Sequence, residues 1–174
     1  MFIGNSNLYI FMAIIDVVLK DQLRTIIESQ KNTAKLGPEI IQRELDVPSS
    51  KTQILIITGI RRAGKSTLLK QIMSKQKIFY YLNFEDPRLK TFTIQEYPKL
   101  MDAFKESYGQ SKVYFFDEIQ NFEEWERYVR MLHDSKNQVF LTGSNASLLS
   151  KELGTKLTGR HLTKELFPFS YTET

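Results

Sequence analysis

The chain has 174 residues, of which 41% are hydrophobic and 25% are charged, a composition typical of one folded domain and unlike that of a disordered or fibrous protein. It contains no cysteine, which excludes disulfides, thiolate nucleophiles and cysteine-ligated metal centres. The net charge of +4 is mildly basic. Such a charge suits a phosphate-bearing ligand but is too small to indicate nucleic-acid binding by itself.

The first apolar run, residues 8–15, is too short to span a membrane, because a spanning helix needs about 20 apolar residues. The first basic residue is Lys20 and Asp16 ends the run, so the chain lacks the features of a secretory signal. We therefore expect a cytoplasmic protein without a membrane segment. The run is interpreted as a short strand or the buried start of a helix, and Met12 is an alternative translational start.

Residues 1–50 are expected to form an N-terminal extension whose helices pack on the rest of the chain. Apolar residues recur at helical spacing over 16–31, with charged residues on the other face, which predicts an amphipathic helix. The pair Gly37 and Pro38 breaks the chain. A short helix is expected over 39–45, followed by a loop.

Residues 51–174 alternate between short apolar runs and amphipathic stretches. The apolar runs predict buried strands over 53–58, 78–83, 113–117 and 139–142. The amphipathic stretches predict helices over 65–76, 94–107 and 122–133. A last segment, 161–169, is compatible with a fifth strand. Alternation of this kind predicts an α/β fold, with a parallel sheet flanked by helices.

Residues 59–66, with the sequence GIRRAGKS, match the phosphate-loop pattern G-x-x-x-x-G-K-[ST] at every fixed position. Glycines let the backbone wrap closely, so that its N–H groups point at phosphate oxygens, and the following helix adds its N-terminal dipole. We expect Lys65 to reach the β- and γ-phosphates and Ser66 to bind Mg²⁺. Thr67 is expected to add a hydroxyl near the α-phosphate. The motif lies between a predicted strand and a predicted helix, as nucleotide binding requires.

The residues expected to contact a nucleotide lie in this loop and after a later strand. They are Gly59, Arg61, Arg62, Ala63, Gly64, Lys65, Ser66, Thr67 and Asn145. Arg61 and Arg62 occupy variable positions of the loop pattern. Contact with phosphate, contact with a neighbouring subunit and simple solvation all remain open for these two arginines.

Two acids are adjacent at the end of the apolar run VYFFD: Asp117 is its last residue and Glu118 follows directly. A carboxylate at the carboxyl end of a parallel strand lies at the crevice where α/β sheets bind ligands. We expect Asp117 to hold Mg²⁺ and Glu118 to act as the catalytic base that deprotonates a water attacking the γ-phosphate. The sequence lacks the Asn-Lys-x-Asp pattern of GTP-binding switches, so an ATPase is the better interpretation.

Three more polar residues are candidates for the site. Ser144 and Asn145 follow the strand predicted over 139–142, where a side chain can detect a γ-phosphate or cap the next helix. Both interpretations of this pair stay open. Arg160 is a candidate catalytic residue that supplies positive charge to a transition state, in its own chain or in an adjacent subunit.

Polar residues also end the strand predicted over 78–83. Asn83, Glu85 and Asp86 either line the site or make a turn before Pro87. An aromatic and aliphatic stripe in the last predicted helix has helical spacing and is interpreted as core-facing, not as a platform for stacking bases.

Five motifs in order resemble those of a known family: GIRRAGKST, YLNFEDPRL, FFDEIQ, LTGSNASLL and LTGR with FPFSYTE. The set is similar to prokaryotic AAA-type P-loop ATPases that carry a C-terminal domain of unknown function, from about Ile40 to the end. The resemblance implies a three-layer P-loop NTPase core in which the sensor strand separates the phosphate-loop strand from the Walker B strand. It implies MgATP as the ligand and matches Lys65 and Ser66 to Walker A. It also matches Asp117 and Glu118 to Walker B.

Members of that family continue well beyond the FPFS motif, whereas this sequence stops at Thr174. We therefore expect a truncated product or an excised module, with an extension over 1–50 and an AAA-like ATPase domain over 51–174. The leading hypothesis is Mg²⁺-dependent ATP hydrolysis. The alternative is a nucleotide-dependent binding or switch module with little turnover. Possible partners are further copies of the chain, or a protein or DNA engaged through the missing C-terminal domain.

Overall fold

The computed structural model describes residues 4–34, 53–144 and 159–167, and for residues 4–12 and Thr33 it describes the backbone alone. Five parallel strands form one sheet in the order β2-β3-β4-β1-β5. The strands are β1 (Ile54–Thr58), β2 (Tyr80–Asn83), β3 (Val113–Asp117), β4 (Gln138–Gly143) and β5 (His161–Glu165). The parallel α/β sheet and its fifth strand are as predicted.

Four α-helices accompany the sheet within the described residues. They are α1 (Gly4–Thr33), α2 (Lys65–Met73), α3 (Tyr97–Tyr108) and α4 (Trp125–Asp134). Three short 3₁₀ turns join them: η1 (Pro87–Leu89), η2 (Ile94–Glu96) and η3 (Ile119–Asn121).

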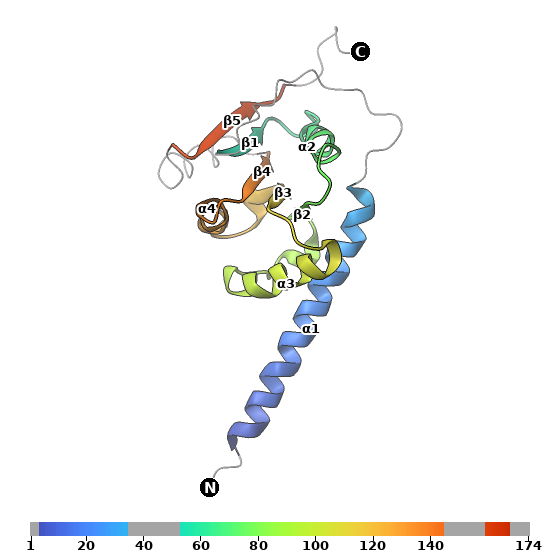
Figure 1. Ribbon diagram of the computed structural model, residues 1–174, viewed down its shortest axis with the longest axis vertical. Helices are drawn as coiled ribbons and strands as arrows, with labels where there is room; N and C mark the ends of the chain where they lie inside the picture. Colours follow the sequence, from blue (N-terminus) through green and yellow to red (C-terminus); the bar gives the residue numbers. More distant parts are fainter. Residues whose placement is uncertain (1–3, 35–52, 145–158, 168–174) are drawn as a thin grey trace.

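The helices cover both faces of the sheet, which gives three layers (Figure 1). One face packs against α3 and α4, with part of α1 in the same core, and the other face packs against α2. Side chains alternate between the two cores along a strand: Ile54 and Ile56 join the first, and Leu55 and Ile57 the second. Strands buried on both faces explain why the sequence shows continuous apolar runs.

The sensor strand β4 lies between β1 and β3, as the family resemblance implied. The register pairs Thr58 with Gly143 on one side of β4, and Phe116 with Leu141 on the other. The phosphate loop and the acidic pair therefore emerge at the same edge of the sheet, from strands separated by a single neighbour.

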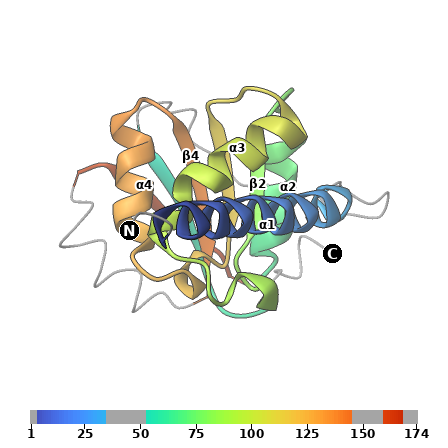
Figure 2. The same ribbon diagram turned by 90° about the horizontal axis from the view of Figure 1, so that it is seen from below.

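The N-terminal helix is longer than predicted. It begins at Gly4, so the apolar run is helical, and residues 13–18 are exposed instead of buried. Val17, for example, is 60% exposed. The carboxyl half of α1 packs against α3 and β2, and the amino-terminal part extends beyond the domain (Figure 1). Figure 2, seen from below, shows α1 lying across the domain. None of the helices in the described part of the chain is long and apolar enough to cross a membrane.

Two other boundaries differ for local reasons. The helix predicted over 94–107 divides into η2 and α3, because Pro98 occupies the first turn of α3 and has no N–H for a continuous helix. The helix predicted over 122–133 begins only at Trp125, after Glu124 adopts a left-handed conformation with φ 58°. The helix predicted over 39–45 lies outside the described residues.

Candidate functional site

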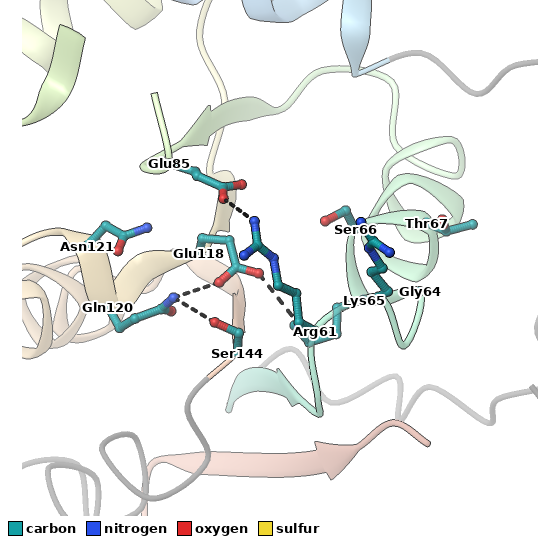
Figure 3. A pocket seen from close by; sticks show the side chains of 11 residues that line it. Arg61, Gly64, Lys65, Ser66, Thr67, Glu85, Glu118, Gln120, Asn121 and Ser144 are labelled. Atoms are coloured by element: carbon teal, nitrogen blue, oxygen red, sulfur yellow. Dashed lines mark hydrogen bonds and ion pairs between the residues drawn. The ribbon is translucent and has the colours of Figure 1, made fainter. Parts of the chain in front are cut away.

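A cavity of about 480 Å³ opens at the carboxyl ends of β1, β3 and β4 (Figure 3). The loop after β1 and the start of α2 contribute residues 61–62 and 64–67. Glu85 follows β2, and Glu118, Gln120 and Asn121 follow β3. Ser144, at the end of β4, closes the lining. The structure thus brings the predicted phosphate loop, the predicted base and the predicted sensor serine together at one site.

The loop conformation depends on two glycines with positive φ. Gly59 has φ 146°, and a Cβ atom at this position would collide with the carbonyl oxygen of Leu166. That close approach is part of the sheet, because the Leu166 N–H donates to the Thr58 carbonyl at 2.7 Å. Gly64, with φ 87°, precedes the first residue of α2. Glycine is therefore needed at both ends of the loop for a backbone reason.

Lys65 is buried, with only 4% of its surface exposed. Its Nζ donates to the carbonyl oxygens of Gly59 at 3.1 Å and Ile60 at 3.0 Å. The same Nζ lies 3.8 Å from Oε1 of Glu118. The ammonium is therefore held at the cavity by two carbonyls of its own loop and by the Glu118 carboxylate. From this position it can bind an anion in the cavity.

Asp117 is buried next to the cavity and contacts the lining residue Ser66. Its carboxylate accepts a hydrogen bond from Ser66 at 3.2 Å and another from the Thr142 hydroxyl. Tyr81 donates to the other carboxylate oxygen at 3.5 Å. Burial raises the pKa of Asp117 above its ordinary value, although the hydrogen bonds from Thr142 and Ser66 act in the opposite direction.

Glu118 has a left-handed backbone conformation, with φ 51° and ψ 49°. Its N–H donates to the Thr142 hydroxyl at 2.9 Å, and Oε2 of its side chain accepts from Gln120 at 2.6 Å. The left-handed turn separates the two acids: Asp117 faces Ser66 below the loop, whereas Glu118 lines the cavity. Adjacent acids in the sequence therefore take different positions at the site.

Thr142 and Gln120 contact the candidate site and were not predicted from the sequence. Both lay in segments that the sequence patterns had identified: Thr142 ends the strand predicted over 139–142, and Gln120 ends the FFDEIQ motif. A polar residue at the end of an otherwise apolar buried strand was the available signal for Thr142. Its hydroxyl joins the two acids, because it accepts from the backbone N–H of Glu118 and donates to the carboxylate of Asp117.

Of the polar residues after β2, only Glu85 lines the cavity, where it lies 3.7 Å from the exposed Arg61. Asn83 makes the turn by accepting from the Glu85 N–H at 2.8 Å. Asp86 caps η1 and pairs with Arg88 at 2.7 Å. Both interpretations of this segment therefore apply, to different residues.

Among the remaining predicted site residues that the structure describes, Ala63 and Arg160 do not line the cavity. Ala63 is buried in the loop, and Asn145 lies outside the described residues. Arg160 precedes β5 at the amino edge of the sheet, where its carbonyl accepts from the Ile54 N–H at 2.9 Å and its Nε lies 3.7 Å from Asp134. This is the opposite edge from the cavity, so the structure does not bring Arg160 to the site of its own chain.

Within the described residues, no group of three or more His, Cys, Asp or Glu side chains is arranged to hold a metal. Mg²⁺ sites in nucleotide-binding proteins differ from such clusters, because they combine one or two protein oxygens with phosphate oxygens. Ser66 and Asp117 offer neighbouring oxygens of the chemical type that Mg²⁺ prefers.

A family model described as an AAA domain matches residues 51–174. An uncharacterized protein of Methanocaldococcus jannaschii is 39% identical over 137 residues, which is 78% of this chain and 31% of that protein. An uncharacterized protein of Haemophilus influenzae is 40% identical over 130 residues, 69% of this chain and 32% of that protein. The chain thus spans about a third of the length of these relatives.

Solved structures also resemble the chain. The Walker-type ATPase of Pyrococcus abyssi has a TM-score of 0.44 at 18% identity, covering 69% of this chain and 50% of its own. A Pnkp1/Rnl/Hen1 complex has a TM-score of 0.40 at 20% identity, covering 70% of this chain and 37% of that one. The family match over residues 51–174 confirms the resemblance seen in the motifs: the chain belongs to the AAA domain family of P-loop ATPases.

Proposed function

We propose that the AAA domain binds MgATP in the cavity and hydrolyses its terminal phosphate. The observation that carries the proposal is the convergence of Lys65, the Ser66–Asp117 pair and Glu118 at one edge of a parallel sheet. Each group has the chemistry that one part of the reaction needs, and the groups come from two distant parts of the chain, the phosphate loop and the end of β3.

The phosphates would lie against the loop over 59–66, where the N-terminus of α2 and the ammonium of Lys65 favour negative charge. Ser66 and Asp117 would hold Mg²⁺, since they offer a hydroxyl and a carboxylate oxygen 3.2 Å apart. When bound, this ion neutralises charge on the phosphate oxygens. It would also favour the ionised form of Asp117, against the effect of burial on its pKa.

Glu118 would accept the proton of the attacking water. Its carboxylate lines the cavity, and its side chain is 16% exposed, so water can reach it. Asp117 is a poorer base for this step because it is 2% exposed and already accepts hydrogen bonds from Ser66 and Thr142.

The second candidate function is a nucleotide-dependent binding module with little turnover. The position of Arg160 favours it: in one copy, the described residues place this arginine at the edge of the sheet away from the cavity. An arginine supplied by an adjacent copy would restore turnover, and rate per molecule would then rise with protein concentration.

Calorimetric titration with ATP, with Mg²⁺ or with EDTA, tests the binding step. Lys65→Ala should weaken binding about 10- to 100-fold, because a charge-assisted contact to phosphate is lost. Lys70→Ala, on the same helix and outside the cavity, is the matched control and should bind normally. Equal affinity of the Lys65→Ala and wild-type chains would remove the proposed site.

Glu118→Gln tests the hydrolytic step separately. It should keep ATP affinity within about threefold and lower phosphate release by about 10²- to 10⁴-fold, since the amide cannot take up the proton. Normal release by Glu118→Gln would assign the base to another residue.

A further inference from the structure

Gln120 lies on η3, in the turn that follows Glu118, and joins the ends of two strands. Its Nε2 donates to Oε2 of Glu118 at 2.6 Å and to Oγ of Ser144 at 3.1 Å. Figure 3 shows both bonds converging on the one amide nitrogen. A primary amide has two N–H groups, so the nitrogen can serve both acceptors at once.

The orientation of the amide follows from this chemistry. Turning the group over would place Oε1 against the Glu118 carboxylate, where two acceptors would repel. In the observed orientation, Oε1 is buried and accepts no hydrogen bond within the described part of the chain. The hydrogen bond to Glu118 therefore holds the Gln120 amide in an orientation that leaves Oε1 of Gln120 without a hydrogen bond. Burying an unpaired oxygen costs free energy, and no other contact of the turn accounts for this orientation.

Two other contacts of Glu118 act on its backbone and on its other carboxylate oxygen. Its N–H is bonded to Thr142, which fixes the backbone, and Nζ of Lys65 is 3.8 Å from Oε1, beyond a hydrogen bond. Among the described residues, Gln120 is the hydrogen-bond donor to the Glu118 carboxylate. The hydrogen bond from Gln120 therefore fixes Oε2 of Glu118, while the ion pair with Lys65 attracts Oε1 without the directionality of a hydrogen bond.

We propose that Gln120 is a positioning residue that orients Glu118 and couples its orientation to Ser144. Ser144 lines the cavity and accepts from Gln120, which leaves its own hydroxyl proton free to donate to an anion such as a γ-phosphate. Donation by Ser144 strengthens its acceptance from Gln120, so occupancy of the cavity is transmitted along the chain of hydrogen bonds to Glu118. This inference rests on the proposed hydrolysis and adds how the base is aligned.

Gln120→Glu is the sharpest test, because it keeps the shape of the side chain, removes both N–H donors and places a like charge beside Glu118. We expect kcat to fall about 100-fold, the usual effect of a misaligned catalytic group, with KM and Kd for ATP within about threefold. Gln120→Ala should behave in the same way without the added charge. Gln22→Glu makes the same chemical change on the exposed face of α1 and should leave both constants unchanged.

The coupling to Ser144 is tested by a double-mutant cycle on kcat. Ser144→Ala should lower kcat, and adding it to Gln120→Ala should cause little further loss, because both changes break the same link. Losses that multiply would show that Ser144 and Gln120 act independently and would overturn the coupling.

The failure of this inference differs from the failure of the proposed function. If the wild-type chain hydrolyses ATP and Gln120→Glu and Gln120→Ala stay within twofold of its kcat, only the role of Gln120 is overturned. If both variants lose ATP affinity as well as turnover, Gln120 is structural, and the inference is again overturned. If the wild-type chain binds ATP and releases no phosphate, hydrolysis fails, and the inference fails with it.

Discussion

The hydrogen bonds of Thr142 predict how much its hydroxyl contributes to the free energy of unfolding. It is fully buried at the end of β4, where its hydroxyl accepts from the Glu118 N–H at 2.9 Å and donates to the Asp117 carboxylate. Thr142→Val has nearly the same shape and lacks the hydroxyl. The change therefore removes both hydrogen bonds and leaves the surrounding packing in place.

The expected cost is the sum of two contributions. A hydrogen bond to a charged group contributes about 1.5–3 kcal/mol, and an unpaired buried N–H costs about 1–3 kcal/mol. The Glu118 N–H is only partly buried, so its cost takes the low end of that range. We therefore expect Thr142→Val to lower the free energy of unfolding by about 3 kcal/mol.

Urea unfolding followed by circular dichroism measures this difference, provided that the denaturant slope is unchanged. Thr142→Ser keeps the hydroxyl and should recover most of the loss. Thr163→Val, the same change at an exposed position of β5, should stay within about 0.5 kcal/mol of wild type. A Thr142→Val protein as stable as wild type would refute the reasoning that this hydroxyl supports the acidic pair.

Three further predictions concern the loop and two carboxylates. Gly59→Ala should destabilise the fold by about 1–3 kcal/mol and weaken ATP binding, because φ is 146° and the new Cβ would meet the Leu166 carbonyl; an unchanged urea midpoint would contradict this. Burial raises the pKa of Asp117 in the folded state. The ionised carboxylate therefore destabilises the fold at a pH above this pKa, and the destabilisation is relieved as the pH falls through it. Asp117→Asn should therefore raise the urea midpoint at pH 7 in EDTA while abolishing any stabilisation by MgATP, and a lower midpoint in EDTA would count against the assignment. The pKa of Asp86 shifts in the opposite direction, because the hydrogen bond from Arg88 lowers it to about 2. The ionised Asp86 therefore stabilises the fold above pH 3.8, its ordinary pKa, and this stabilisation is lost as the pH falls toward 2. The stability difference between wild type and Asp86→Asn, measured by urea midpoints, should narrow from pH 7 to pH 3; a constant difference would contradict the shift.

The parallel sheet was predictable because it rests on local patterns, whereas the place of the sensor strand between its neighbours was implied by the family resemblance. Buried strands gave continuous apolar runs, and the motif order fixed which strands carry the loop and the acids. The start of α1 was not predictable in the same way. Residues 13–18 are exposed all round the helix, so their apolar side chains show no periodicity that distinguishes a helix from a strand.

The site was predicted where neighbouring residues in the sequence share a task, as in the loop over 59–66 and the pair Asp117 and Glu118. It was not predicted where a contact depends on tertiary structure. The bond from Gln120 to Glu118 requires the left-handed backbone of Glu118, and the placement of Arg160 depends on which edge of the sheet its strand starts from. Neither property is a feature of residue type or spacing.

The central claim is that this domain hydrolyses ATP with Glu118 as the base. Its most direct test is steady-state phosphate release from MgATP by the 174-residue chain, across a range of protein concentrations, beside Glu118→Gln and Lys65→Ala. We predict phosphate release that Glu118→Gln lowers by about 10²- to 10⁴-fold and that Lys65→Ala also lowers. The rate per molecule should rise with protein concentration if adjacent copies supply Arg160. Folded wild-type chain that binds ATP and releases no phosphate at any concentration would contradict the claim and leave a nucleotide-binding module.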